Sequence, residues 1–310
     1  MRKILITGVA GFIGSNLASY LINLNKYKVI GIDNLSYGLI EQIPKKVKFY
    51  HEDIRSKKLS KIFKDVDTVF HLAAKNCISD CQANPVETYD INVHGSVNIF
   101  QYAKENKVKK IIYADSSAVY EGIKHFPSKE NITAPLSYYA LSKKSASDFL
   151  NGFANLNKIH AVALRYFNVY GVNQDYRRSI PPLMSSLIIK LLTKKKPIIY
   201  GDGRKKRDFI HVDDINDFHH ILIEKNMRKN YEVFNLGSGV NYSVNEIFLK
   251  IKDLLNLSVN PVYKKDLPGE AEENLADIKL AKQLNWSPKI KIDEGISEMI
   301  QHIKKNVIER

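Results

Sequence analysis

The sequence predicts an α/β protein whose parallel sheet is covered by helices on both faces. In the first half of the 310-residue chain, short apolar runs alternate with longer helical patterns, which is typical of parallel strands joined by crossover helices. The first apolar run also leads directly into a glycine-rich turn. We expect strands at 3–7, 28–32, 47–50, 68–72, 110–114 and 161–165, and helices at 14–24, 86–107 and 139–155.

The alternation of strand and helix patterns ends after Gly171, where polar and proline-containing stretches become frequent. A helical pattern ends near Leu192, and residues 197–203 and 261–269 are rich in turn-forming residues. We therefore expect a first domain over 1–171 with a return segment near 208–237. A smaller α/β domain over 172–207 and 238–310 is expected to bind the substrate.

The charge of the chain is strongly positive, because 47 Lys and Arg outnumber 33 Asp and Glu and leave a net charge of +14. The lysines are scattered and do not form a stripe with interleaved aromatic residues, so we expect no nucleic-acid partner. A positive field would instead attract a small anionic substrate. No apolar run approaches the roughly 18 residues of a membrane span, so we expect no membrane partner.

The two cysteines, Cys77 and Cys81, are four residues apart, which is a spacing that predicts free thiols and not a disulfide framework. Neither cysteine has the Cys or His neighbours of a zinc site, so we expect no metal. The chain enters its first strand at once, and the stretch before the first glycines is too short for a signal peptide. These features favour a cytoplasmic protein.

The glycine-rich turn is TGVAGFIG at 7–14, with Gly8, Gly11 and Gly14 spaced three apart between a strand and a helix. Glycines in this context let the backbone turn sharply and let a pyrophosphate approach the free N–H groups of a helix N-terminus. Asp33 lies 19 residues after Gly14, at the end of the second strand. An acidic residue there can accept the ribose hydroxyls and would repel a 2′-phosphate. The motif therefore predicts a Rossmann-type, doubly wound fold that binds NAD in preference to NADP.

A second motif places Tyr139 and Lys143 four residues apart on a predicted helix, so that they share one face. A lysine ammonium beside a tyrosine hydroxyl lowers its pKa and makes it a usable acid or base near neutral pH. Ser116 follows the strand at 110–114 and is therefore expected at the same end of the sheet. A Ser, Tyr and Lys set can hold a sugar hydroxyl and move its proton while a nicotinamide takes the hydride.

These motifs occur in one order along the chain: TGVAGFIG, HLAA at 71–74, SSAVY at 116–120, YALSK at 139–143, RYFNVYG at 165–171, GDG at 201–203 and RDFIHVDD at 207–214. Together they resemble the extended short-chain dehydrogenase/reductase family, in its NAD-dependent sugar-nucleotide epimerase/dehydratase branch. UDP-glucose 4-epimerases are the nearest type. The resemblance covers essentially the whole chain.

The resemblance implies roles for individual residues. Tyr139 would be the base, Lys143 would bind the nicotinamide ribose and tune Tyr139, and Ser116 would hold the reacting hydroxyl. The implied cofactor-binding set is Gly8, Gly11, Phe12, Ile13, Gly14, Asp33, Asn34, Asp53, Ile54, Leu72, Ala73, Ala74, Tyr139, Lys143 and Phe167. The implied substrate-binding set is Ser116, Asn168, Arg207, Glu270 and Asn274, with Asn168 and Arg207 on the diphosphate.

The reaction is indicated by the two positions after Ser116. The 4,6-dehydratases of the branch carry an acidic pair there, because loss of water needs an added acid and base, whereas this chain has Ser117 and Ala118. We therefore expect 4-epimerisation of a UDP-hexose through a transient 4-keto sugar, with NAD regenerated at every turnover. Four alternatives stay open: another epimerase of this family, a reductase, a 4,6-dehydratase, and a non-catalytic NAD-binding module.

Three positions depart from the family pattern. Asp115 stands where a small residue is usual, and Tyr138 stands where proline is common. Leu267 replaces an arginine that would grip the phosphates, and Lys264 or Lys265 could take its place.

Two further expectations come from the resemblance. Asn274 occupies the position that walls the pocket beside the 2-substituent of the sugar, and its small amide leaves room for an N-acetyl group, so UDP-N-acetylglucosamine and its C4 epimer are expected as substrates beside UDP-glucose and UDP-galactose. Helices within 86–107 and 139–155 are expected to form a four-helix bundle with a second subunit, giving a homodimer.

Overall fold

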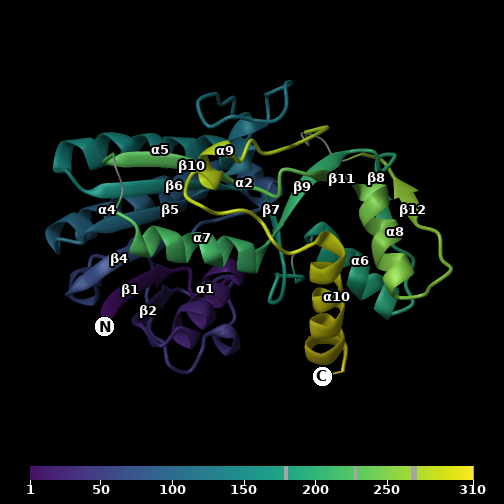
Figure 1. Ribbon diagram of the computed structural model, residues 1–310, viewed down its shortest axis with the longest axis horizontal. Coiled ribbons are helices and arrows are strands. Elements are labelled where there is room, and N and C mark those ends of the chain that lie inside the picture. Colours follow the sequence, from purple (N-terminus) through teal and green to yellow (C-terminus); the bar gives the residue numbers. More distant parts are fainter. Residues whose placement is uncertain (178–180, 227–228, 267–270, 310) are drawn as a thin grey trace.

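The main feature of the computed structural model is a parallel sheet that lies between two layers of helices (Figure 1). The structure describes residues 1–177, 181–226, 229–266 and 271–309. Within these residues the sheet has seven strands, in the spatial order β10 (Tyr231–Leu236), β6 (His160–Tyr166), β5 (Lys110–Ser116), β4 (Val66–His71), β1 (Arg2–Thr7), β2 (Tyr27–Asp33) and β3 (Lys48–His51). All neighbouring pairs are parallel. The order runs outward in both directions from β1 and β4, so the predicted doubly wound Rossmann-type fold is confirmed.

Each face of the sheet has its own hydrophobic core. One core joins the sheet to α1 (Phe12–Asn23) and α7 (Val212–Glu224), through side chains such as Leu17 and Phe218. The other joins it to α4 (Gly95–Glu105) and α5 (Tyr138–Asn157), through side chains such as Phe100 and Leu150. Successive side chains of a strand point to opposite faces, so each central strand contributes to both cores.

The predicted helix at 86–107 is interrupted by a turn of different winding. The chain forms α3 (Pro85–Tyr89), a π-helical turn η3 (Asp90–His94) and then α4 without leaving the helical path. A short helix, α2 (Ile78–Ala83), precedes it, and 3₁₀ turns η1 (Ile40–Gln42), η2 (Leu59–Phe63) and η4 (Ser117–Tyr120) lie in the connections. The other predicted strands and helices in this half agree with the structure to within about two residues at each end.

The smaller part of the molecule lies beyond the carboxyl ends of the strands (Figure 1). Its described residues form two short sheets. One joins β11 (Asn241–Ser243), β9 (Lys206–His211) and β7 (Asn168–Tyr170), and the other joins β12 (Val262–Lys264) and β8 (Ile198–Tyr200). Its core is built from α6 (Leu183–Leu192), α8 (Val244–Leu254) and α10 (Ile292–Ile303), with η5 (Lys304–Ile308) at the end. The short helix α9 (Lys279–Lys282) packs back near β10.

The chain crosses between the two parts more than once. After β7 and β9 it returns to the large sheet, where α7 lies beside α1 and β10 pairs with β6. We keep the division into two domains as a proposal, with β7 and β9 forming the joint between them.

Among the helices in the described ranges, none is both long enough and apolar enough to cross a membrane.

Candidate active site

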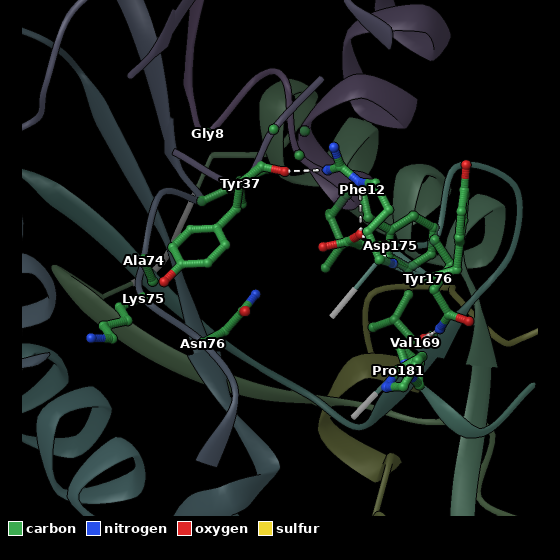
Figure 2. A pocket seen from close by; sticks show the side chains of 18 of the residues that line it. Gly8, Phe12, Tyr37, Ala74, Lys75, Asn76, Val169, Asp175, Tyr176 and Pro181 are labelled. Carbon is green, nitrogen blue, oxygen red and sulfur yellow. Dashed lines mark hydrogen bonds and ion pairs between the residues drawn. The ribbon is translucent and has the colours of Figure 1, made fainter. Parts of the chain in front are cut away.

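A cavity of about 800 Å³ lies at the carboxyl ends of the strands, between the large sheet and the smaller part (Figure 2). Its walls come from the turns that follow β1, β2 and β4 on one side, and from the segments around β7, β8 and β9 on the other. Ligands of open parallel sheets bind at this end of the strands. The fold therefore brings residues from both parts of the molecule to one site.

The glycine-rich turn after β1 is shaped for close backbone approach. Gly8 has a φ of +75°, and a Cβ there would lie 2.8 Å from the backbone nitrogen of Ala73. A Cβ on Gly14 would lie 2.1 Å from the Gly8 carbonyl oxygen. Helix α1 then begins at Phe12, with no side chain in the described residues capping its first turn. Its N–H groups are therefore available for a phosphate, and the turn fits the pyrophosphate of NAD.

Asp33 ends β2 and borders the same cavity. One carboxylate oxygen accepts the N–H of Ala10 at 3.0 Å, and the other accepts the N–H of Leu35 at 2.8 Å. Burial raises the pKa of this carboxyl, while the two backbone donors lower it. The two backbone N–H groups fix Asp33 in place. Because each carboxylate oxygen has more than one lone pair, Asp33 can still accept hydrogen bonds from ribose hydroxyls.

An ion-pair network lies in the part of the cavity wall that follows β2 and β3. Asp53 accepts hydrogen bonds from Arg55 and, at 2.9 Å, from the amide of Asn34. Arg55 also pairs with Asp90 at 2.6 Å, across to η3. The Arg55 guanidinium holds the pKa of Asp53 well below its usual range. Asn34, Asp53 and Ile54 all line the cavity, where the resemblance expects the adenosine.

Of the predicted cofactor residues, the cavity brings together Gly8, Gly11, Phe12, Ile13, Gly14, Asp33, Asn34, Asp53, Ile54, Leu72, Ala73 and Ala74. Phe167 is buried behind this surface, where its ring stacks on Tyr120 with centroids 6.0 Å apart.

None of the three candidate catalytic residues is among the described residues that line the cavity; they lie at the end of β5 and at the start of α5. Ser116 is the last residue of β5, and its hydroxyl accepts the N–H of Ala118 at 3.1 Å. Tyr139 is in the first turn of α5, and Lys143 follows one turn later with its side chain buried against β5. Ala114, two residues before Ser116, lines the cavity. All three predicted catalytic residues therefore lie on adjacent elements at this edge.

Lys143 is fully enclosed, with its ammonium 4.5 Å from the centroid of the Tyr113 ring. Burial lowers the pKa of Lys143 to about 8, and the nearby Asp115 carboxylate raises it against this effect.

The two residues predicted to hold the diphosphate, Asn168 and Arg207, both line the cavity from β7 and β9. The neighbouring Asp208 points to the opposite side of β9, where its carboxylate accepts the backbone N–H groups of Ser238 at 2.7 Å and of Ala276 at 3.1 Å. Asp208 therefore does not neutralise Arg207 in a surface ion pair.

Asn274 lies next to this pair and is absent from the cavity wall formed by the described residues. Its amide oxygen accepts the backbone N–H of Asp208 at 2.8 Å and the side-chain amide of Asn168 at 3.2 Å. Asn274 thus supports Asn168 from behind. Glu270 and Leu267 lie outside the residues that the structure describes.

A family model described as the NAD-dependent epimerase/dehydratase family matches residues 4–237, which include the glycine turn, Ser116, Tyr139 and Lys143. The chain belongs to this family. The predicted family resemblance, the predicted cofactor NAD and the prediction of an enzyme are thereby confirmed.

Relatives of known or assigned activity match the chain along its whole length. A putative UDP-glucose 4-epimerase from Methanocaldococcus jannaschii is 39% identical and covers 98% of this chain and 99% of its own. The crystal structure of UDP-glucose 4-epimerase from Thermotoga maritima with UDP-glucose has a TM-score of 0.94 and 32% identity, over 99% of this chain and 100% of that one. UDP-N-acetylglucosamine 4-epimerase from Methanobrevibacter ruminantium, in complex with UDP-N-acetylmuramic acid, has a TM-score of 0.94 and 33% identity, over 99% of both chains.

Several cavity residues of this family member were not predicted from its sequence. Arg177 donates to the backbone carbonyl of Tyr37 at 2.6 Å, which connects the segment after β7 to the turn after β2. No sequence pattern links two residues so far apart. Lys205 is buried in the cavity wall and pairs with Asp266 at 2.7 Å. The period of two along a strand could have predicted it, because Lys205, which directly precedes β9, is two residues before Arg207 and both line the cavity.

A possible metal-ligand group was also not predicted. His211, Asp213 and Glu298 have ligand atoms within 4.8 Å of one another, and none of the three lines the cavity.

Proposed function

We propose that this family member interconverts the C4 epimers of a UDP-hexose, with UDP-glucose and UDP-galactose as the first substrates to test. Family membership and the epimerases among its relatives support the reaction class. The observation that supports epimerisation over the other reactions of the family is the set of acidic groups around Ser116.

The segment after Ser116 lacks an available acid and base pair. Ser117 and Ala118 form the start of η4, and neither carries a carboxylate. Asp115, on the other side of Ser116, is buried and holds the guanidinium of Arg165 at 3.1 Å. Its remaining oxygen accepts the Ser116 N–H at 2.8 Å.

Glu121, at the end of the same turn, is also engaged. Its carboxylate accepts the N–H of Ser137 at 2.7 Å, the Ser137 hydroxyl at 2.9 Å and the N–H of Leu136 at 3.2 Å. Elimination of water would need a second proton shuttle, and both nearby carboxylates serve other contacts. Epimerisation needs only one group that removes and returns a proton, together with a reversible hydride transfer, and the site can support both.

The chain's own residues would then act as follows. Tyr139 removes the proton of the sugar 4-hydroxyl and later returns it, helped by the positive charge of Lys143. Ser116 holds the same hydroxyl in line. Bound NAD supplies the reversible hydride acceptor. The glycine turn, Asp33 and the Asn34 and Asp53 pair would hold the cofactor, since the turn has the free N–H groups and the close approach that a pyrophosphate needs.

The inversion itself requires that one end of the substrate stays fixed while the sugar turns over. Asn168 and Arg207 lie on neighbouring strands of the smaller part and both face the cavity. A diphosphate held there would leave the hexose free to rotate about its link to the phosphate and to present either face to the cofactor.

The test uses the protein as purified, with no added cofactor. UDP-galactose and UDP-glucose are supplied in separate reactions, and a panel of dTDP-, GDP- and CDP-sugars is supplied as further candidate substrates. The products of every reaction are identified by proton NMR. We expect interconversion to one equilibrium mixture from either side, with no net absorbance change at 340 nm. Stoichiometric NADH consumption would identify a reductase, a 4-keto-6-deoxy product would identify a dehydratase, and no product with any sugar would indicate a non-catalytic NAD module.

We propose the N-acetylated hexoses as a second substrate class, and Asn274, which contacts Asn168 from behind the cavity wall, is the residue to test. Its amide oxygen is used by Asp208 and Asn168, so its NH₂ group is the part that can donate to an acetamido carbonyl. A relative of this chain is a UDP-N-acetylglucosamine 4-epimerase. Asn274→Asp keeps the acceptor oxygen and removes the donor, and a lost hydrogen bond of this kind costs ~1 to 3 kcal/mol.

We therefore expect Asn274→Asp to lower kcat/KM for UDP-N-acetylglucosamine by about tenfold relative to UDP-glucose. Asn274→Tyr should abolish the N-acetylated activity by filling the space. An unchanged ratio between the two substrates in both variants would remove Asn274 from the sugar pocket.

A further inference from the structure

Lys143 carries a positive charge in a position that is closed to solvent. Its side chain belongs to α5 but packs inward against β5, and the residue is 2% exposed. An ammonium group without water around it is strongly disfavoured unless nearby groups stabilise the charge. The surroundings of Lys143 must therefore contain features that keep it protonated.

The face of β5 that meets α5 supplies two such features. Tyr113 and Asp115 are two residues apart on the strand, so their side chains point to the same face. Tyr113 belongs to the core shared with Leu150 of α5, whereas Ile112 belongs to the core on the other face of the sheet. The ammonium of Lys143 lies 4.5 Å from the centroid of the Tyr113 ring, within the range of a cation–π contact.

Asp115 is held rigidly beside this contact. It is 2% exposed, and one oxygen accepts the N–H of Ser116 at 2.8 Å. The other accepts the Nε of Arg165, which is its direct neighbour on β6, at 3.1 Å. Arg165 also donates to the hydroxyl of Tyr120 at 2.8 Å and to the backbone carbonyl of Glu130 at 2.7 Å. The guanidinium is thus oriented by three partners. Burial raises the pKa of the Asp115 carboxyl, whereas the positive charges of Arg165 and Lys143 lower it and favour the carboxylate.

We propose that Tyr113 and Asp115 together form a seat for the Lys143 ammonium, and that they act as positioning residues for the acid–base chemistry of Tyr139. The aromatic face of Tyr113 and the carboxylate of Asp115 hold the charge of Lys143 in a site from which water is excluded. The catalytic consequence of this inference rests on the proposed function. The placement of Tyr113 and Asp115 around Lys143 rests on the geometry of β5 and α5.

The other titratable groups around Lys143 do not supply a negative charge. His71 on β4 is neutral, because burial and the charge of Lys143 lower its pKa to about 3. Burial raises the pKa of the Cys81 thiol on α2, so it stays protonated near neutral pH. Among the described residues, the carboxylate that raises the pKa of Lys143 is that of Asp115. Tyr139 shares the face of α5 and would gain from the cation once substrate is bound.

The direction of the effect can be worked out from these charges. Burial lowers the pKa of Lys143 to about 8, and Asp115 opposes this shift. Removing the carboxylate leaves burial, and the charge of Arg165, to act alone. The pKa of Lys143 should then fall further, so that the lysine loses its proton near neutral pH and Tyr139 loses the neighbouring charge that favours its phenolate.

The direct test is the titration of Lys143 by NMR in the NAD-bound enzyme labelled with ¹³Cε-lysine. The resonance is assigned by its loss in Lys143→Met. In Asp115→Asn, we expect its titration midpoint to move down by about one pH unit or more. In Tyr113→Leu, we expect a downward shift of about half a pH unit, and Tyr113→Phe, which keeps the aromatic face, should titrate like the wild type.

Asp148→Asn is the matched control for a carboxylate on the same helix. Asp148 lies on the exposed side of α5, where it pairs with Lys144 at 2.6 Å. The substitution should leave both the Lys143 titration and the activity unchanged. If Asp115→Asn fails to fold because Arg165 loses its counter-ion, the comparison of Tyr113→Leu with Tyr113→Phe decides the proposal alone.

The second readout is the pH profile of kcat. The alkaline limb should move to lower pH in Asp115→Asn and in Tyr113→Leu, by the same amounts as the lysine titration. If the Lys143 titration curves of these two variants coincide with that of the wild type, the proposal that Tyr113 and Asp115 stabilise the Lys143 ammonium is wrong, whatever the activity. The titration does not require turnover. If the titration midpoint of Lys143 shifts in the variants but the protein epimerises no sugar, the proposed function is wrong and the proposed stabilisation of Lys143 by Tyr113 and Asp115 is retained.

Discussion

Tyr139 is the residue on which the proposed chemistry depends most directly. It lies one helical turn before Lys143, and Ser116 ends the adjacent strand. We expect Tyr139→Phe to lower kcat by ~10² to 10⁴-fold, because that is the usual contribution of a general acid–base group. NAD content and the unfolding midpoint should stay at wild-type values, since the ring is retained. A variant within about tenfold of wild-type activity would show that another group moves the proton.

Asp33 is expected to decide between the two nicotinamide cofactors. Its carboxylate is fixed by Ala10 and Leu35 and faces the cavity, so a 2′-phosphate would meet a buried negative charge. Asp33→Asn should raise the affinity for NADP relative to NAD by at least about tenfold, as measured by calorimetry after removal of bound cofactor. Tighter binding of NADP than of NAD by the wild-type protein would contradict this role.

At the scale of elements, the start of α5 matters most for the proposed chemistry, because it sets the position of Tyr139. Ser137 is the N-cap, and its hydroxyl accepts the N–H of Ala140 at 3.1 Å while it donates to Glu121 at 2.9 Å. This cap sets where the first turn of α5 begins, and the first turn carries Tyr139. The position of the base is therefore controlled by two residues that do not touch the cavity.

We expect Ser137→Ala to lower the free energy of unfolding by ~1 kcal/mol, which is typical for loss of an N-cap. It should also lower kcat several-fold, because Tyr139 becomes less well positioned. Urea denaturation and steady-state kinetics measure the two effects, and Ser137→Thr, which retains the hydroxyl, serves as the control. An unfolding midpoint equal to that of the wild type would mean that Glu121 alone holds the helix start.

At the scale of the whole molecule, an apolar stripe on the outer face of α5 indicates a partner surface. Tyr138, Leu141, Phe149 and Leu156 are spaced so that they share one side of the helix, and all are exposed. Val86 and Tyr89 on α3 are exposed as well. Exposed apolar stripes of this length are unusual on monomers. We propose that this stripe forms the core of the homodimer that the family resemblance implies.

Light scattering after size exclusion should give twice the 35.4 kDa mass of one chain. Replacing both Leu141 and Phe149 by Glu should yield a monomer, because four charges would be buried in a symmetric interface. Leu249→Glu, at an exposed leucine of α8, is the matched control and should leave the dimer intact. A wild-type monomer at micromolar concentration would exclude this interface.

The sequence by itself determined the elements of the large sheet and the identity of the cofactor turn. Strand and helix periodicity, with glycine spacing, depend on residues close together in the chain, and these patterns survive into the folded molecule. For the same reason Ser116, Tyr139 and Lys143 could be assigned to neighbouring strand and helix ends. The interruption at Asp90–His94 was missed, because a single i→i+5 turn within a longer helix is too short to stand out in the periodicity of apolar residues.

Only the tertiary structure decided what surrounds those residues. The pairing of Asp115 with Arg165, the support of Asn168 by Asn274 and the contact of Arg177 with Tyr37 each join positions at least 50 residues apart. No local period encodes such contacts, since they depend on which strands become neighbours and on how the smaller part closes over the sheet. Asp115 is an unexplained departure from the family pattern in the sequence alone, whereas in the fold it pairs with Arg165 and its carboxylate raises the pKa of a buried lysine.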